Sequence, residues 1–409
     1  MKKFVSLALT AMLATGALAG LTACGEDKEY TVGMICLHGD ESTYDKNFID
    51  AMKKACKNKG ISDELTIVTG IPETTECYET AKDLVDQGCD VIFADSFGHE
   101  AHMLKAAKEF PDVEFCHATG TMAHTENVAN FHNAFASIYE GRYLAGVAAG
   151  MKLVEMHKAG TLKDSNYVNA EKTIIKMGYV GAFTYAEVIS GYTSFYLGAK
   201  SVVKEENLDI SMEVQFTGSW YDETEERNSA LTLINNGAAL ISQHADSMGA
   251  PSACEEKGIP NVSYNGSTQA SCPNTYIVSS RINWVPYFEY MIDCTLNDKK
   301  IDTDWTGTLS NEAVVLTSVN DKAAAAGTQA KINEVKAKLS AGEINVFDTA
   351  TFTVGGVALT SYKADVDTDA AFTPDTEVIA NGIFQESKFR SAPYFDVKID
   401  GITLLNSKF

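Results

Sequence analysis

Aromatic side chains stand beside carboxyl, amide and hydroxyl groups at the points where several apolar segments of the sequence end. The candidates are Ser96, Phe97, Trp220, Asp222, Asp246 and Asn265. A flat ring offers a stacking face, and carboxylate or amide groups are fixed hydrogen-bonding partners for a planar polar molecule. These residue types therefore predict non-covalent binding of a small, ring-shaped ligand.

The first polar loop adds two further candidates, Tyr44 and Asp45. Phe48 is an alternative to Tyr44 as the stacking ring, and Asp45 could instead be a helix N-cap. His117 and His244 also lie at strand ends, where a histidine is more often a hydrogen-bonded structural residue. Trp220 is the strongest candidate, because a large ring between polar residues at a strand end is poorly placed for a core.

Catalytic patterns do not accompany these residues. The sequence has no G-x-S-x-G, H-E-x-x-H or phosphate-binding loop. Hydrolysis of a nucleoside would need clustered acids or a metal at the ribose. A binding protein is therefore favoured over a nucleoside hydrolase, and we expect no catalytic residue, metal site or cofactor.

Alternating strands and helices must position the candidate side chains. The stretch Thr217–Ser247 reads as a polar turn after an apolar strand, a helix, a turn at Asn236-Gly237, and a second apolar strand at Ala238–Ile241. Ligands of open α/β sheets bind outside the carboxyl ends of the strands. This unit is thus expected to supply one side of a pocket.

The same alternation runs through most of the chain and restarts once, which predicts parallel sheets in two lobes. The first set has strands at Thr31–Leu37, Leu65–Thr69, Val91–Ala94 and Val113–His117, with helices at Phe48–Lys57, Tyr78–Gln87 and Glu100–Glu109. The second has helices at Tyr139–Leu153, Val188–Lys204 and Ala250–Lys257, and strands at Ile174–Val180, Ser211–Phe216 and Asn261–Tyr264. The expected fold is a two-lobe α/β protein with a hinge cleft.

The predicted organisation is lobe 1 at 30–131, with 283–330 returning to it, and lobe 2 at 132–282. Residues 331–409 form a C-terminal extension that packs on the lobes. It contains an amphipathic helix at Gln329–Ser340, a turn at Gly355-Gly356 and a final strand pattern at Val397–Leu405.

The N-terminus has the features of a secretory signal. Lys2 and Lys3 precede an uncharged apolar run that ends in Leu21-Thr22-Ala23-Cys24. This ending resembles a bacterial lipobox, which implies a signal peptide at 1–23, lipidation of Cys24 and a tether at 24–29. We expect an exported protein anchored by lipid to the extracytoplasmic face of the cell membrane.

Composition limits the partners. The chain has 409 residues and a net charge of -22, which argues against nucleic acid as a partner. Its nine cysteines show no C-x-x-C pair or regular spacing, so mostly free, buried thiols are expected. A monomer suits a cleft that opens and closes.

Several stretches, taken in order, resemble the basic membrane protein (BMP, PnrA-like) family of lipoproteins. They are Phe93-Ala94-Asp95-Ser96-Phe97-Gly98, Tyr139-Glu140-Gly141-Arg142-Tyr143, Gly178-Tyr179-Val180-Gly181, Ser219-Trp220-Tyr221-Asp222, Gln243-His244-Ala245-Asp246-Ser247 and Asn283-Trp284. The resemblance implies a type I periplasmic-binding-protein fold and a substrate-binding component that delivers its ligand to an ABC permease.

For the ligand, the resemblance implies a purine nucleoside or nucleobase stacked between aromatic rings of the two lobes. It makes Trp220 and Tyr44 the stacking candidates, with Phe97 near the base and Asp222, Asp246 and Ser96 as polar contacts. Asn265 falls where many members have an acid that holds ribose. A free base, another planar heterocycle such as a flavin, and a ligand-sensing role without transport stay open as alternatives.

Overall fold

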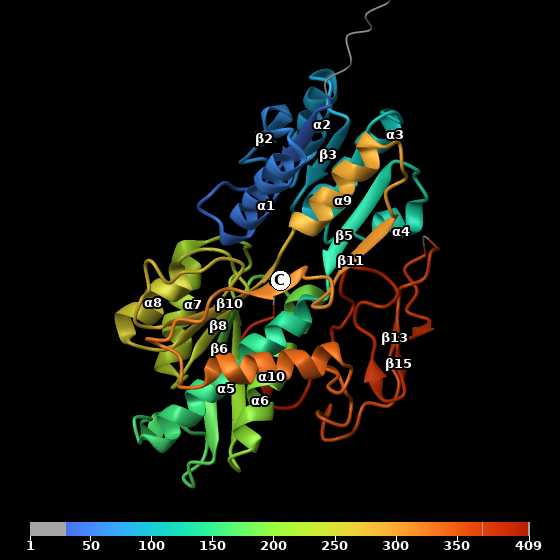
Figure 1. Ribbon diagram of the computed structural model, residues 1–409. Helices are drawn as coiled ribbons and strands as arrows, with labels where there is room; N and C mark the ends of the chain where they lie inside the picture. The colour runs from blue at the N-terminus through green and yellow to red at the C-terminus, as the bar shows by residue number, and fades with distance from the viewer. Residues whose placement is uncertain (1–29, 370, 408–409) are drawn as a thin grey trace, which may run out of the picture.

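The computed structural model describes residues 30–369 and 371–407, and within them two main parallel sheets form two lobes (Figure 1). Cys24 and the signal segment lie outside the described residues. No helix in the described part of the chain has both the length and the apolar character needed to cross a bilayer.

The sheet of lobe 1 has the strand order β11-β5-β4-β3-β1-β2, and every neighbouring pair is parallel. Its strands are β1 (Val32–Ile35), β2 (Leu65–Val68), β3 (Val91–Ala94), β4 (Glu114–Ala118), β5 (Phe131–Ala136) and β11 (Asp304–Gly307). The helices of this lobe are α1 (Thr43–Lys59), α2 (Thr75–Asp86), α3 (Glu100–Glu109), α4 (Met122–Glu126) and α9 (Val285–Leu296).

The sheet of lobe 2 has the order β12-β10-β9-β8-β6-β7-β17, and only the edge strand β12 is antiparallel to its neighbour. Its strands are β6 (Ile174–Gly181), β7 (Asp209–Phe216), β8 (Ile241–Gln243), β9 (Asn261–Tyr264), β10 (Tyr276–Ile282), β12 (Val314–Leu316) and β17 (Ile402–Leu404). Its helices are α5 (Ile138–Lys158), α6 (Ala186–Lys204), α7 (Glu223–Asn235), α8 (Gly249–Lys257) and α10 (Thr328–Ser340).

The expected two-lobe α/β architecture is confirmed, but three boundaries differ from the prediction. The boundary at 131 and 132 is wrong, because β5 runs to Ala136 inside the sheet of lobe 1. The segment 283–330 returns to lobe 1 only through α9 and β11, since β12 pairs with β10 in lobe 2. The first helix starts at Thr43 rather than at Phe48, because Ser42 caps it by accepting a hydrogen bond from the Asp45 N–H.

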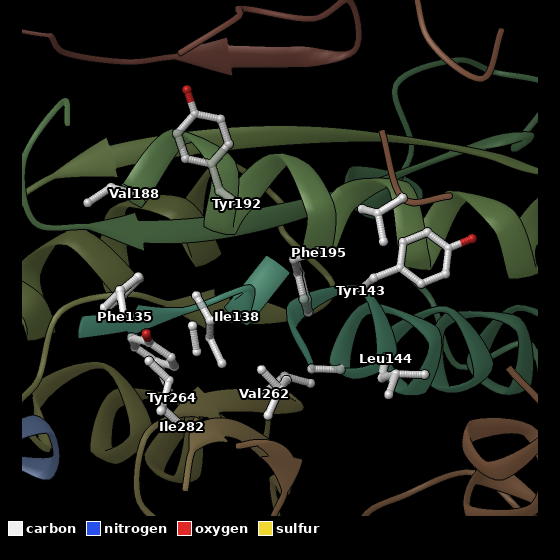
Figure 2. Close-up of a cluster of buried hydrophobic side chains, with 14 of the residues drawn as sticks. Phe135, Ile138, Tyr143, Leu144, Val188, Tyr192, Phe195, Val262, Tyr264 and Ile282 are labelled. Carbon is white, nitrogen blue, oxygen red and sulfur yellow. The ribbon is translucent and has the colours of Figure 1, made fainter. Parts of the chain in front are cut away.

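Helices α5 and α6 cross closely in the core of lobe 2. A Cβ atom at Gly146 would lie 2.1 Å from the carbonyl oxygen of Phe195, and one at Gly198 would lie 2.1 Å from that of Tyr143. Only glycine fits at these two positions. The surrounding side chains form one buried cluster that reaches from Phe135 of lobe 1 to Tyr264 of lobe 2 (Figure 2).

The C-terminal extension contacts both lobes (Figure 1). Its last strand, β17, continues the sheet of lobe 2 beside β7. Toward lobe 1, Ser391 donates hydrogen bonds from its backbone N–H and its hydroxyl to Asp304 of β11. The short strands β13 (Lys363–Ala364), β14 (Thr376–Glu377), β15 (Ile379–Ala380) and β16 (Ile383–Phe384) form two small hairpins between these contacts.

The cysteines behave as small buried hydrophobes. Cys36, Cys56, Cys77, Cys116, Cys254, Cys272 and Cys294 are buried free thiols, which confirms the prediction of mostly free thiols. Burial raises the pKa of Cys36 well above its usual value, so this thiol stays protonated.

Candidate functional site

A cavity between the lobes lies beyond the carboxyl ends of the central strands. The space between its wall atoms totals about 390 Å³, but the centre of a water molecule fits in only about 20 Å³ of it. The walls therefore approach each other closely, as in a closed cleft. Loops and helix starts that follow β1, β3, β4, β6, β7 and β8, and the last residue of β9, supply the lining: Leu37, His38, Tyr44, Asp45, Ser96, Phe97, Thr119, Glu187, Trp220, His244, Asp246 and Tyr264.

Six of the eight predicted binding residues line this cavity, namely Tyr44, Asp45, Ser96, Phe97, Trp220 and Asp246. Phe48 does not, because its ring is buried in the core and stacks on Trp284 with centroids 4.4 Å apart. Tyr44 is thus the ring of the first helix that faces the cleft. Its hydroxyl donates to the Asp95 carbonyl oxygen at 2.8 Å.

Asp45 is held as an acceptor in the first turn of α1. One carboxylate oxygen accepts the His38 N–H at 2.7 Å, and the other accepts the Ser42 hydroxyl at 2.6 Å. Asp95 lies beside it, fully buried, and its Oδ2 has no hydrogen bond within the described residues. Burial, and next the charge of Asp45, raise the pKa of Asp95 well above its usual range. The neutral form of Asp95 is therefore favoured.

The potential ligand atoms of Cys36, Asp45 and Asp95 lie within 4.8 Å of one another. A metal would require the thiolate and both carboxylates. Burial instead favours the protonated forms of Cys36 and Asp95. A cation would therefore have to displace these protons in order to bind here.

The other two predicted residues of lobe 1 are Ser96, whose hydroxyl already has a hydrogen-bond partner, and Phe97, which offers a ring. The Ser96 hydroxyl donates to Glu73 at 2.6 Å, so it already has an acceptor. Phe97 is 43% exposed and stacks on Tyr185 of lobe 2, with centroids 5.0 Å apart and planes inclined by 27°. The two rings therefore form an aromatic contact between lobe 1 and lobe 2.

In lobe 2, Trp220 belongs to an aromatic cluster beside the cavity. Phe183 meets it edge to face at 4.9 Å, and Phe183 also stacks on Tyr185 at 5.2 Å. Together with Phe97, these rings provide π faces from both lobes. Such faces suit an aromatic ligand.

Two predicted residues do not line the cavity. Asp222 is the N-cap of α7, where its carboxylate accepts the Glu225 N–H at 2.9 Å. Asn265 lies behind Asp246 and donates to its carboxylate at 3.3 Å. Burial, and next the charge of Glu226, raise the pKa of Asp246 well above its usual range.

The prediction missed Glu187 and Tyr264 and set His244 aside as structural. Glu187 sits in the first turn of α6, directly after the aromatic loop that the pattern had marked, and Tyr264 ends a predicted strand. The structural interpretation of His244 is correct in that both its ring nitrogens have partners, yet the ring also faces the cavity. His117 is fully buried and bonds the Ser96 carbonyl, as a structural histidine does.

Comparisons with known proteins identify the family of this chain. Residues 33–349 match the family model described as ABC transporter substrate-binding protein PnrA-like. A purine-binding protein of Brucella abortus is 30% identical over 305 residues, which are 73% of this chain and 77% of the relative. The nucleoside-binding protein BmpA of Lactococcus lactis is 27% identical over 186 residues, which are 45% of this chain and 44% of that protein.

Solved structures show the same fold at low identity. A solute-binding protein of Aeropyrum pernix K1 has a TM-score of 0.64 at 15% identity and covers 77% of this chain and 92% of its own. One from Conexibacter woesei has a TM-score of 0.59 at 19% identity, with 77% and 98% covered. Since the family model spans most of the described residues, the chain belongs to the PnrA-like family of ABC transporter substrate-binding proteins.

Proposed function

We propose that this protein captures a purine nucleobase or nucleoside outside the cytoplasm and delivers it to an ABC permease. The observation that carries the proposal is the cavity wall itself, in which Phe97, Tyr44 and Trp220 offer rings while Asp45 and Asp246 offer acceptors. A purine has a flat face and N–H donors on its edge, and both find partners there.

Closure of the lobes is the proposed mechanism. The closed form already has inter-lobe contacts between Phe97 and Tyr185 and between His38 and Tyr221, whose ring centroids are 5.3 Å apart. Because the cavity is so narrow, a ring can enter only when the lobes part. A ligand that stacks between them adds contacts in the closed state and shifts the population toward it.

The Asp246 end of the cavity favours a free base over a nucleoside. Asn265 and Thr43 both bond Asp246, and they separate the cavity from a polar groove that contains Asp40 and Arg281. A ribose would have to displace these contacts. Asn265 also lacks the carboxylate that the family resemblance implies for holding ribose.

Cys24 is the proposed attachment point for the lipid that keeps the protein at the membrane. The test is metabolic labelling with a fatty acid, in which the wild type takes up label and Cys24→Ser does not. Release of unmodified wild-type protein would contradict the anchor.

A thermal-shift assay on the chain from Gly25 onward, which leaves out the lipidation site, tests the ligand. The panel contains adenine, guanine, hypoxanthine, their nucleosides, riboflavin and glucose. A ligand at a hundredfold excess over its Kd stabilises the folded state by about 2.7 kcal/mol. We expect purines to raise Tm in the wild type and to raise it less in Trp220→Ala. A rise with riboflavin alone would contradict the purine assignment.

A sugar is the second candidate. The carboxyl groups of Asp45, Asp246 and Glu187 around the cavity can accept hydrogen bonds from paired sugar hydroxyls as well as from a purine edge. One relative, 32% identical over 199 residues that are 49% of this chain and 44% of its own, carries the name of a glucose-binding protein of Haloferax volcanii. A Tm rise with glucose and none with purines would select this candidate.

A transport protein and a ligand-sensing lipoprotein would have the same pocket, so the pocket does not distinguish these two roles. Uptake of labelled adenine by cells with and without the gene separates them: lost uptake supports delivery to a permease, and unchanged uptake supports a sensing lipoprotein.

A further inference from the structure

Three side chains of lobe 2 form a buried chain of hydrogen bonds that ends in the cavity. Arg142 of α5 is 1% exposed, and its Nη1 donates to the Gln243 carbonyl at 2.9 Å. Its Nη2 lies 3.0 Å from Nδ1 of His244. On the other side of the ring, His244 Nε2 lies 3.2 Å from Oε1 of Glu187.

The order of donors and acceptors in this chain is fixed by chemistry. A guanidinium can only donate, so Nδ1 of His244 accepts and its proton resides on Nε2. Nε2–H then donates to Glu187. Burial, with a smaller effect from Arg142, lowers the pKa of His244, which keeps the ring neutral despite the opposing effect of Glu187.

These hydrogen bonds orient the carboxylate of Glu187, so that one of its oxygens is left for the cavity. Val188, the next residue, is buried in the core cluster and fixes the start of α6 (Figure 2). The Glu187 side chain is 13% exposed and lines the cavity, and no hydrogen bond to its Oε2 occurs among the described residues. Beside it, the buried hydroxyl of Tyr264 has no partner in the same part of the chain.

No lysine or arginine lines the cavity within the described residues. Arg142 does not, because its guanidinium lies 3.3 Å from the ring centroid of Tyr264 and bonds Gln243 and His244. The Tyr264 hydroxyl is the donor that the protein itself offers beside Glu187, and an N–H of the ligand is the other. A keto oxygen in that place would face a carboxylate, leaving both acceptors unpaired, which is costly in a buried site.

Building on the proposed function, we propose that Glu187 determines which purine binds. It selects purines that carry an exocyclic amino group, and Arg142 and His244 are the residues that position its carboxylate. This role differs from a purely structural tie between α5, β8 and α6, because a tie would affect all ligands equally.

Calorimetry with two matched ligand pairs tests the selection. Adenine and hypoxanthine differ in the amino or keto group at C6, and guanine differs from hypoxanthine by one amino group at C2. We expect the wild type to bind the amino member of at least one pair tenfold or more tightly. In Glu187→Gln, His244 holds the amide oxygen and turns the NH₂ toward the ligand, so that preference should fall at least tenfold.

The exposed Glu76→Gln is the matched control, since it changes the same atoms at a residue that does not line the cavity. If purines bind the wild type and the ratio within both pairs is unchanged in Glu187→Gln, this inference is wrong and the proposed function stands. If no purine binds the wild type, the proposed function itself fails.

His244 variants test the positioning. His244→Gln can accept from Arg142 and donate to Glu187, whereas His244→Leu can do neither. We expect the Gln variant to keep the amino preference and the Leu variant to lose most of it, with circular dichroism confirming that both are folded. Equal preference in a folded His244→Leu protein would overturn the positioning role.

Discussion

Thr43 of lobe 1 donates twice to the carbonyl oxygen of Asp246 in lobe 2, once from its backbone N–H and once from its hydroxyl, each at 3.1 Å. The donor N–H is one of the free groups at the N-terminus of α1, so the helix end is used to join the lobes. The acceptor belongs to a residue whose side chain lines the cavity. Closure and occupation of the site are therefore linked through one residue.

The first prediction concerns the two hydrogen bonds from Thr43 to Asp246, which two substitutions remove one after the other. Thr43→Val deletes the hydroxyl, and Thr43→Pro also deletes the N–H, at a first helical position that tolerates proline. Each bond contributes about 0.5–1.5 kcal/mol, so ligand affinity should fall by roughly 2- to 10-fold per bond. Calorimetry measures the affinity. Lys59→Ala, on the outer end of the same helix, is the control, and equal affinity in all four proteins would contradict the link.

The second prediction concerns Trp220 and its neighbours. Replacing it with alanine removes a stacking face and should weaken ligand binding by roughly tenfold or more, since an aromatic pair contributes about 0.5–1.5 kcal/mol beyond its buried area. Trp220→Phe retains part of the face and should bind with intermediate affinity. Ligand-dependent tryptophan fluorescence checks this independently. The change should vanish in Trp220→Phe and persist in Trp305→Phe, and the opposite pattern would place the ligand elsewhere.

The third prediction separates the two aromatic residues at the start of α1. Phe48 packs on Trp284 in the core, so Phe48→Leu should lower the free energy of unfolding by about 1 kcal/mol or more while leaving ligand affinity nearly unchanged. Tyr44→Ala should do the reverse, with the larger loss in affinity. Urea unfolding and calorimetry on both variants measure the two effects. A larger affinity loss in Phe48→Leu would restore Phe48 as the stacking ring.

The local elements of the fold are predictable from the sequence. Val91–Ala94, Glu100–Glu109 and Asn261–Tyr264 are predicted with the bounds that the structure has. In each case a short apolar run or a periodic segment is enclosed by polar or helix-ending residues. The lobe to which β5 and β12 belong is not predictable in this way, because it depends on pairing with strands far away in the sequence.

The sequence predicts those site residues whose place depends only on their position at the end of a strand. Trp220 and Asp246 follow strands and line the cavity. Asp222 shows the limit: it also follows a strand, but Glu225 three residues later is the signal of a helix N-cap, and that local role prevails. Glu187 required knowledge of the packing between α5 and β8, which places Arg142 and His244 behind it.

The last prediction concerns pH and Glu386 of the C-terminal extension. This carboxyl is 1% exposed and accepts the Ser190 hydroxyl, so it joins the extension to α6. Burial raises its pKa from 4.5 to about 7. The folded state then holds a proton that the unfolded state has released between these values, so stability falls as pH rises from about 4.5 to 7.

The linkage implies a loss of on the order of 2–3 kcal/mol across this window from Glu386 alone. Glu386→Gln keeps an acceptor for Ser190 and cannot titrate, so its free energy of unfolding should depend less on pH. Urea unfolding of both proteins at pH 5, 6, 7 and 8 measures the difference. Glu226, whose pKa is also raised by burial to about 7, gives the wild type a second contribution of the same sign that remains in the variant. Parallel pH profiles for the two proteins would show that Glu386 is ionised in the folded state, and a flatter profile for Glu386→Gln would show that its proton stabilises the contact between the extension and lobe 2.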